Sequence, residues 1–288
     1  MLSAAAPPVL DGIAPLVPRY DLFLCDVWGV VHNGKAAYPE AVDALERARA
    51  AGVTVVFISN APRPGAVIEQ QIANYAVPRS CYDTIVGSGD VARDELRQRP
   101  GAKLFHLGPE RDLPNYQGLD LELVDLEQAE LVVCTGLFDD TTETPDDYRD
   151  MLAEICRRGL PFICANPDIV VERGDKLIWC AGALAEAYEK MGGKAIFAGK
   201  PHGAIYDLAL ARTAEIRGRP VARARVLAIG DGVRTDLAGA VRHGFDCLFV
   251  AGGIHAAELD LDGANVPDAS IFAEAGAWPA AIIRRLVW

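Results

Sequence analysis

Residues 23–31 read Phe-Leu-Cys-Asp-Val-Trp-Gly-Val-Val. The apolar start of this stretch predicts a buried strand, Phe23–Asp26, that carries Asp26 at its carboxyl end. Ligands of open α/β sheets bind beyond the carboxyl ends of the strands, so an aspartate at this point is placed for chemistry rather than for packing. Trp28 follows two positions later, and its effect on that chemistry is the main question that the sequence raises.

Apolar strands alternate with helical segments on both sides of residues 23–31. The predicted elements are a helix over 39–51, a strand over 53–58, a helix over 64–75, a helix over 201–216, a strand over 226–229, a helix over 236–243 and a strand over 247–250. Gly52 and Gly244 follow two of these helices and are typical stop signals. The alternation predicts an α/β fold with a doubly wound, Rossmann-like parallel sheet that is covered by helices.

The middle of the chain has shorter strands and a well-marked helix of its own. Strands are predicted over 103–106, 131–134, 162–164 and 177–180. Thr144 and Pro145 begin the helix, two carboxylates suit the positive end of its dipole, and Gly159 ends it. We therefore expect a second α/β unit inserted into the first, with a core domain of residues 1–86 and 193–288 and a cap of residues 87–192.

Two terminal segments are predicted to be helical. Residues 9–17 read as a short helix, and the apolar and basic residues of 278–288 read as an amphipathic helix on the core.

Composition excludes several classes of function. The chain has 288 residues, of which 51% are hydrophobic, and a formal net charge of -12, which argues against a nucleic-acid binder. Its seven cysteines occur singly and are expected to be buried thiols in a reducing compartment. A basic leader and an apolar run of about 18 residues are both missing, so we expect a cytoplasmic protein that does not bind membranes, and we leave a homodimer open.

Three further strand ends carry polar groups that suit a phosphate or a metal. Ser59 and Asn60 follow the strand over 53–58, Lys200 stands between Gly199 and Pro201, and Asp231 and Asp236 flank the turn after the strand over 226–229. Each has an ordinary structural interpretation, such as a helix N-cap or a solvated charge. Together they converge on one crevice of a doubly wound sheet, which favours a common site.

This ordered set resembles the haloacid dehalogenase superfamily of aspartate-nucleophile hydrolases. Asp26 with the residues that follow it matches the first motif in part, Ser59 the second, Lys200 the third, and Asp231 with Asp236 the fourth. The insertion resembles the cap of class IIA, the NagD-like branch, in which Asn166-Pro167-Asp168 looks like a landmark.

The resemblance implies a nucleophile and a metal site. Asp26 would attack phosphorus and become an aspartyl phosphate. Mg²⁺ would be held by Asp26, Asp231 and the backbone carbonyl of Trp28, with Asp236 beside it or in its second shell.

The resemblance also implies residues that bind the substrate. Ser59 and the backbone N–H of Asn60 would hydrogen-bond the phosphoryl oxygens, and Lys200 would neutralise charge on the phosphate and the nucleophile. Asn166 and Asp168 of the cap would contribute to substrate choice, Asp168 by recognising a hydroxyl or an amine.

Trp28 departs from the pattern of phosphatases in this superfamily, which carry a second aspartate there as general acid and base. Indole has no proton that titrates near neutral pH, whereas the carbonyl of Trp28 can still bind a metal. The substrate could have a good leaving group, or His32 or a cap residue could supply the acid, although His32 also reads as an ordinary polar loop residue. The protein could also bind a ligand with little turnover.

The sequence thus predicts a Mg²⁺-dependent phosphohydrolase that acts on a small phosphorylated metabolite through an aspartyl-phosphate intermediate, either slowly or only on good leaving groups. A non-catalytic binding protein for phosphorylated metabolites is the alternative. A metal-independent dehalogenase is less favoured, because Asp231 and Asp236 suit a metal.

Overall fold

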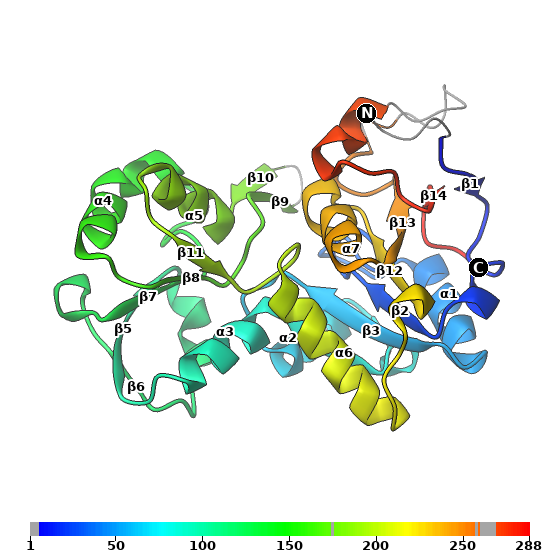
Figure 1. Ribbon diagram of the computed structural model, residues 1–288, viewed down its shortest axis with the longest axis horizontal. Coiled ribbons are helices and arrows are strands. Elements are labelled where there is room, and N and C mark those ends of the chain that lie inside the picture. Colours follow the sequence, from blue (N-terminus) through cyan, green and yellow to red (C-terminus); the bar gives the residue numbers. More distant parts are fainter. Residues whose placement is uncertain (1–5, 174–175, 257–258, 260–268) are drawn as a thin grey trace. The chain divides into compact units, whose positions relative to one another are not determined.

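The computed structural model describes residues 6–173, 176–256, 259 and 269–288 (Figure 1). The chain divides into two compact units. The first consists of Met1–Ser59, Glu69–Val86 and Tyr206–Trp288, and the second of Asn60–Ile68 and Gly87–Ile205. These units differ from the ranges predicted for core and cap at residues 60–68 and 193–205, and the predicted domain ranges stay a prediction.

A seven-stranded sheet forms the centre of the first unit. Its strands are β1 (Val9–Leu10), β2 (Leu22–Cys25), β3 (Thr54–Ser59), β4 (Thr84–Gly87), β12 (Val226–Gly230), β13 (Asp246–Val250) and β14 (Ala281–Ile283). They follow the order β1-β14-β13-β12-β2-β3-β4. β2 pairs in parallel with β12 on one side and with β3 on the other, so the strand that precedes Asp26 is central. This parallel, helix-flanked sheet confirms the predicted fold class.

Four helices begin and end close to the residues predicted for them. They are α1 (Pro39–Ala50), α2 (Gly65–Ala73), α6 (Gly203–Arg217) and α7 (Ala238–His243). Helix α1 buries Ala41, Ala44, Leu45 and Ala48, the spacing of one helical face. Gly244 adopts a left-handed conformation directly after α7, which explains why the helix ends there.

The second unit has a parallel sheet of its own. Its strands are β5 (Ala102–Leu107), β6 (Leu121–Leu123), β7 (Leu131–Cys134), β8 (Phe162–Cys164) and β11 (Ala195–Phe197), in the order β11-β8-β7-β5-β6. Strands β9 (Val170–Arg173) and β10 (Lys176–Trp179) form an antiparallel pair. The helices are α3 (Ser88–Arg97), α4 (Arg149–Arg158) and α5 (Ala181–Lys190).

Helix α4 is bounded by the N-terminal capping residues and the C-terminal glycine that the sequence predicted. Thr144 and Asp147 form a capping box at the start of the short 3-10 helix that leads into α4. Gly159 ends α4 in a left-handed conformation.

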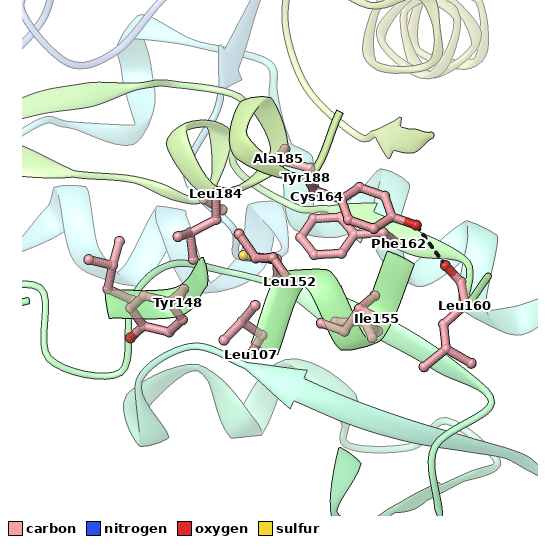
Figure 2. Close-up of a cluster of buried hydrophobic side chains, with 14 of the residues drawn as sticks. Leu107, Tyr148, Leu152, Ile155, Leu160, Phe162, Cys164, Leu184, Ala185 and Tyr188 are labelled. Carbon is pink, nitrogen blue, oxygen red and sulfur yellow. Dashed lines mark hydrogen bonds between the residues drawn. The ribbon is translucent and has the colours of Figure 1, made fainter. Parts of the chain in front are cut away.

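Helices α4 and α5 pack onto the second sheet through a buried apolar cluster (Figure 2). Leu152 and Ile155 of α4 are fully buried in it. The rings of Phe162 and Tyr188 stack with centroids 4.7 Å apart, and the Tyr188 hydroxyl donates to the carbonyl of Leu160. This cluster gives the second unit an apolar core that does not depend on the first.

We expect Leu152→Ala to lower the free energy of unfolding by about 2–5 kcal/mol, because it removes buried methyl groups and leaves a cavity. Chemical denaturation followed by circular dichroism measures the change. Met151→Ala, on the partly buried neighbouring position, is the control and should cost clearly less. Equal losses for the two variants would contradict the packing in Figure 2.

Both predictions of terminal helices are wrong. Residues 9–10 form β1, and β14 lies in the segment predicted as an amphipathic helix. β14 pairs in parallel with β13 and with β1, so the two ends of the chain lie side by side in the sheet. Short apolar runs do not distinguish a strand from a helix, and here pairing at the sheet edge satisfies the backbone.

The cysteines occur as thiols, all seven within the described ranges, and six of them are buried. Among the described helices, none has the length and apolar character to cross a membrane.

Candidate active site

Asp26 directly follows the central strand of the first unit. Its backbone N–H donates to the carbonyl of Ile229 on β12, which continues the sheet pairing by one residue. Only 8% of Asp26 is exposed. Ser59 ends β3 and Asp231 follows β12, so the two strands that flank β2 deliver these residues to the same edge of the sheet.

The carboxylates of Asp26, Asp231 and Asp236 form a buried cluster. One ligand oxygen of each lies within 4.8 Å of the others. Three buried negative charges at this separation repel one another strongly, and a cation removes that cost. The donors are all carboxylate oxygens, the set that Mg²⁺ and other hard cations prefer. The residues present therefore fit the metal that the sequence predicts.

Backbone groups approach Asp231 very closely. The N–H of Ile254 donates to its Oδ2 over 2.9 Å. A Cβ at Gly29 or at Gly253 would lie 2.2 Å or 1.9 Å from the same oxygen, so neither position has room for a side chain. Gly29 also has a positive φ of 79°. Gly253 and Ile254 were missed by the sequence reasoning, although two glycines after a strand are a signal for close backbone approach.

Asp236 lies in a π-helical turn, Val233–Leu237, rather than at the start of the helix as predicted. The N–H of Gly232 donates to its Oδ2 over 3.1 Å. A Cβ at Gly230 would lie 2.1 Å from the Asp236 carboxyl carbon. The turn thus holds this carboxylate against the end of β12, and π turns are frequent at functional sites.

The loop after Asp26 folds back on itself and packs against the side chain of Trp28. The N–H of Gly29 donates to the carbonyl of His32 over 2.9 Å, and the Trp28 and His32 rings meet edge to face with centroids 5.3 Å apart. A Cβ at Gly34, which has a φ of 79°, would lie 2.5 Å from Cη2 of Trp28. Gly34 therefore makes room for the indole.

His32 does not suit the role of a general acid. Its side chain is only 3% exposed, and burial lowers its pKa to about 4. Nδ1 accepts the N–H of Gly34 over 2.9 Å, and the ring also packs against Tyr75. At neutral pH the imidazole is uncharged and serves the packing of the loop.

The second unit brings together the other predicted residues. Nδ2 of Asn60 donates to Oδ1 of Asp168 over 2.8 Å and to the carbonyl of Lys200 over 3.1 Å. The N–H of Lys200 donates back to Oδ1 of Asn60 over 2.7 Å. The N–H of Asp168 donates to Oδ1 of Asn166 over 3.1 Å. These four residues form one hydrogen-bonded group, which single motifs could not have predicted.

Comparison with known families decides the classification. A family model described as haloacid dehalogenase-like hydrolase matches residues 23–122, and one described as HAD-hydrolase-like matches residues 197–274. A crystal structure of a hydrolase of the haloacid dehalogenase-like family from Brucella suis 1330 is 49% identical, with a TM-score of 0.86, over 98% of this chain and 100% of that chain. The chain belongs to the haloacid dehalogenase-like hydrolases.

More distant relatives place it within this hydrolase family. The ribonucleotide monophosphatase NagD of Escherichia coli K12 is 25% identical over 83% of this chain and 90% of its own length, which supports the NagD-like branch. A glycerol phosphate phosphatase from Mycobacterium tuberculosis, solved in complex with magnesium, shares the fold with a TM-score of 0.64. It is 22% identical, over 88% of this chain and 74% of that one. The recognition from four short motifs is confirmed.

Proposed function

We propose that this hydrolase is a Mg²⁺-dependent phosphatase of a small phosphorylated metabolite. The observation that carries the proposal is the buried cluster of Asp26, Asp231 and Asp236 at the carboxyl end of the central strands. The phosphatase names of its relatives support the reaction class. A metal-independent dehalogenase is disfavoured, because it has no use for three adjacent buried carboxylates.

The proposed metal ligands are Asp26, Asp231 and the backbone carbonyl of Trp28, with Asp236 beside them. When bound, Mg²⁺ would offset the charge of the phosphate and orient it. This assignment is compatible with a tryptophan at position 28, because only the backbone carbonyl of that residue would bind the metal. A chain with a net charge of -12 needs such local positive charge to admit an anion.

The proposed chemistry runs in two steps through Asp26. A carboxylate oxygen of Asp26 attacks phosphorus, the bond from phosphorus to the ester oxygen breaks, and the leaving oxygen takes a proton from water. Water then attacks phosphorus and gives up a proton to the solvent, which replaces the one taken by the leaving oxygen. The bond between phosphorus and the Asp26 oxygen breaks, and phosphate leaves. Ser59, the backbone N–H of Asn60 and Lys200 stabilise the phosphoryl oxygens in both steps.

The side chains of Trp28 and His32 cannot assist proton transfer in this scheme. General acid help is worth about 10²–10⁴-fold in rate, so we expect slow turnover of alkyl esters and faster turnover of acyl and aryl phosphates. Asn166 and Asp168 are the candidates for contact with the organic part of the substrate.

Metal dependence tests the proposal. Purified protein is offered acetyl phosphate and p-nitrophenyl phosphate with Mg²⁺ and with EDTA, and we expect turnover only with the metal. Isothermal titration calorimetry should show Mg²⁺ binding that Asp231→Asn weakens at least tenfold, since a charged ligand is lost. Asp11→Asn, at an exposed position, is the control. Metal binding without any turnover would favour the non-catalytic binding protein, and turnover in EDTA would contradict the metal assignment.

A further inference from the structure

Lys200 is among the most deeply buried charged side chains of the second unit, with only 2% of its surface exposed. A buried ammonium group is effective in catalysis only if its chain is held in one place, because a flexible four-carbon stem otherwise samples many positions. The structure fixes Lys200 through its backbone. The side-chain amide of Asn60 pairs with both the N–H and the carbonyl of Lys200, so it holds the backbone of Lys200 on both sides of its Cα.

Asp168 orients that amide. Asn60 is itself buried, with 4% of its surface exposed, and Nδ2 of Asn60 donates to Oδ1 of Asp168. A carboxylate accepts but never donates, so it fixes which end of the amide faces it. The Asn60 oxygen is thereby directed to the N–H of Lys200 rather than to its carbonyl.

The residue before Lys200 shows how tightly this arrangement is packed. A Cβ at Gly199 would lie 2.4 Å from Oδ1 of Asn60, 2.2 Å from Oγ of Ser88 and 2.7 Å from Cδ of Pro167. Any side chain at position 199 would therefore push the Asn60 amide away. The glycine allows the backbone of Lys200 to approach the amide that holds it.

We propose that Asn60 and Asp168 are positioning residues for Lys200, with Asp168 acting through the amide of Asn60. The inference rests on the proposed function, in which Lys200 neutralises the phosphoryl group. It gives Asp168 a role other than recognition of a hydroxyl or an amine on the substrate. The two roles predict different patterns of kcat/KM across substrates when Asp168 is replaced.

A positioning role affects every substrate alike, because the phosphoryl group is common to all of them. We expect Asp168→Leu, a change of similar shape that removes the acceptor, to lower kcat/KM by roughly 10–100-fold, as for loss of a charged hydrogen bond. The factor should be the same for acetyl phosphate, p-nitrophenyl phosphate and glycerol phosphate. Asp168→Asn keeps an acceptor oxygen and should restore most of the activity. Asp147→Asn, at the exposed capping box before α4, is the control that should leave activity unchanged.

A double-mutant cycle isolates the path through Lys200. In a Lys200→Met background, Asp168→Leu should cause no further loss of kcat/KM. A loss that persists there, or one confined to substrates with a hydroxyl or an amine, would overturn the inference and favour direct contact with the leaving group.

A second measurement does not need turnover. Hydrogen exchange of the Lys200 backbone amide reports directly on its bond to Asn60. We expect exchange to be at least tenfold faster in Asp168→Leu than in wild type or Asp168→Asn, and unchanged exchange would overturn the inference. If wild type turns over no substrate, the proposed function fails, whereas the exchange rates still decide whether Asp168 holds Lys200.

Discussion

Asp26→Asn is expected to reduce turnover of every phosphorylated substrate by about 10⁴-fold or more, the scale seen when a nucleophile is removed. The amide is nearly the same size as the carboxylate, so it should pack in the buried site at the end of β2 without loss of the fold. It cannot form the acyl phosphate through which the proposed reaction runs. Steady-state rates with acetyl phosphate and p-nitrophenyl phosphate measure the effect, with Asp11→Asn as the matched control.

Asp26→Asn also removes one proposed metal ligand, so its rate alone does not separate the two roles of Asp26. Mass spectrometry of acid-quenched protein during turnover should show a phosphoryl group on the peptide that contains Asp26. The Asp26→Asn protein should not carry it. Full activity of this variant would refute the nucleophile assignment.

Trp28→Asp is expected to raise kcat/KM for alkyl phosphates by up to about 10²–10⁴-fold, the usual contribution of a general acid. Acetyl phosphate, whose leaving group needs little protonation, should gain far less. The ratio of the rates with glycerol phosphate and acetyl phosphate measures the effect.

Packing around Trp28 works against part of that gain. The indole fills the space that Gly34 leaves and contacts His32, so its removal leaves a cavity in the loop. Trp28→Asn has the same cavity without the acid and is the matched control. If the two variants have equal rates with glycerol phosphate, the proton comes from another source.

The residues at the strand ends could be predicted because local sequence determines them. Apolar runs that end in Asp26, Ser59 and Asp231 indicate buried parallel strands, and the positions of such strand ends relative to one another follow from the topology of the sheet. Gly159 and Gly244 end helices in the left-handed conformation that glycine adopts readily, which is a local property of the residue. The fold and the acidic cluster therefore follow from short stretches of sequence.

Features that depend on distant partners could not be predicted in the same way. Residues 281–283 form a strand because β13 and β1 offer them pairing partners, and their sequence alone suits a helix equally well. The depressed pKa of His32 depends on burial beside Tyr75, more than forty positions away. The hold of Asn60 on Lys200 joins residues 140 positions apart. No spacing rule connects such pairs in a single sequence.

Residues 60–68 belong to the second unit although they are remote from it in sequence, and this matters for engineering. A fragment of residues 87–205, grafted onto another hydrolase, would leave behind the Asn60 amide and the guanidinium of Arg63, which pairs with the buried Asp112 over 3.3 Å. It would also lose the carbonyl of Pro62 that accepts from Asn115. A chimaera that transplants this unit into a relative therefore needs both segments, residues 60–68 as well as residues 87–205.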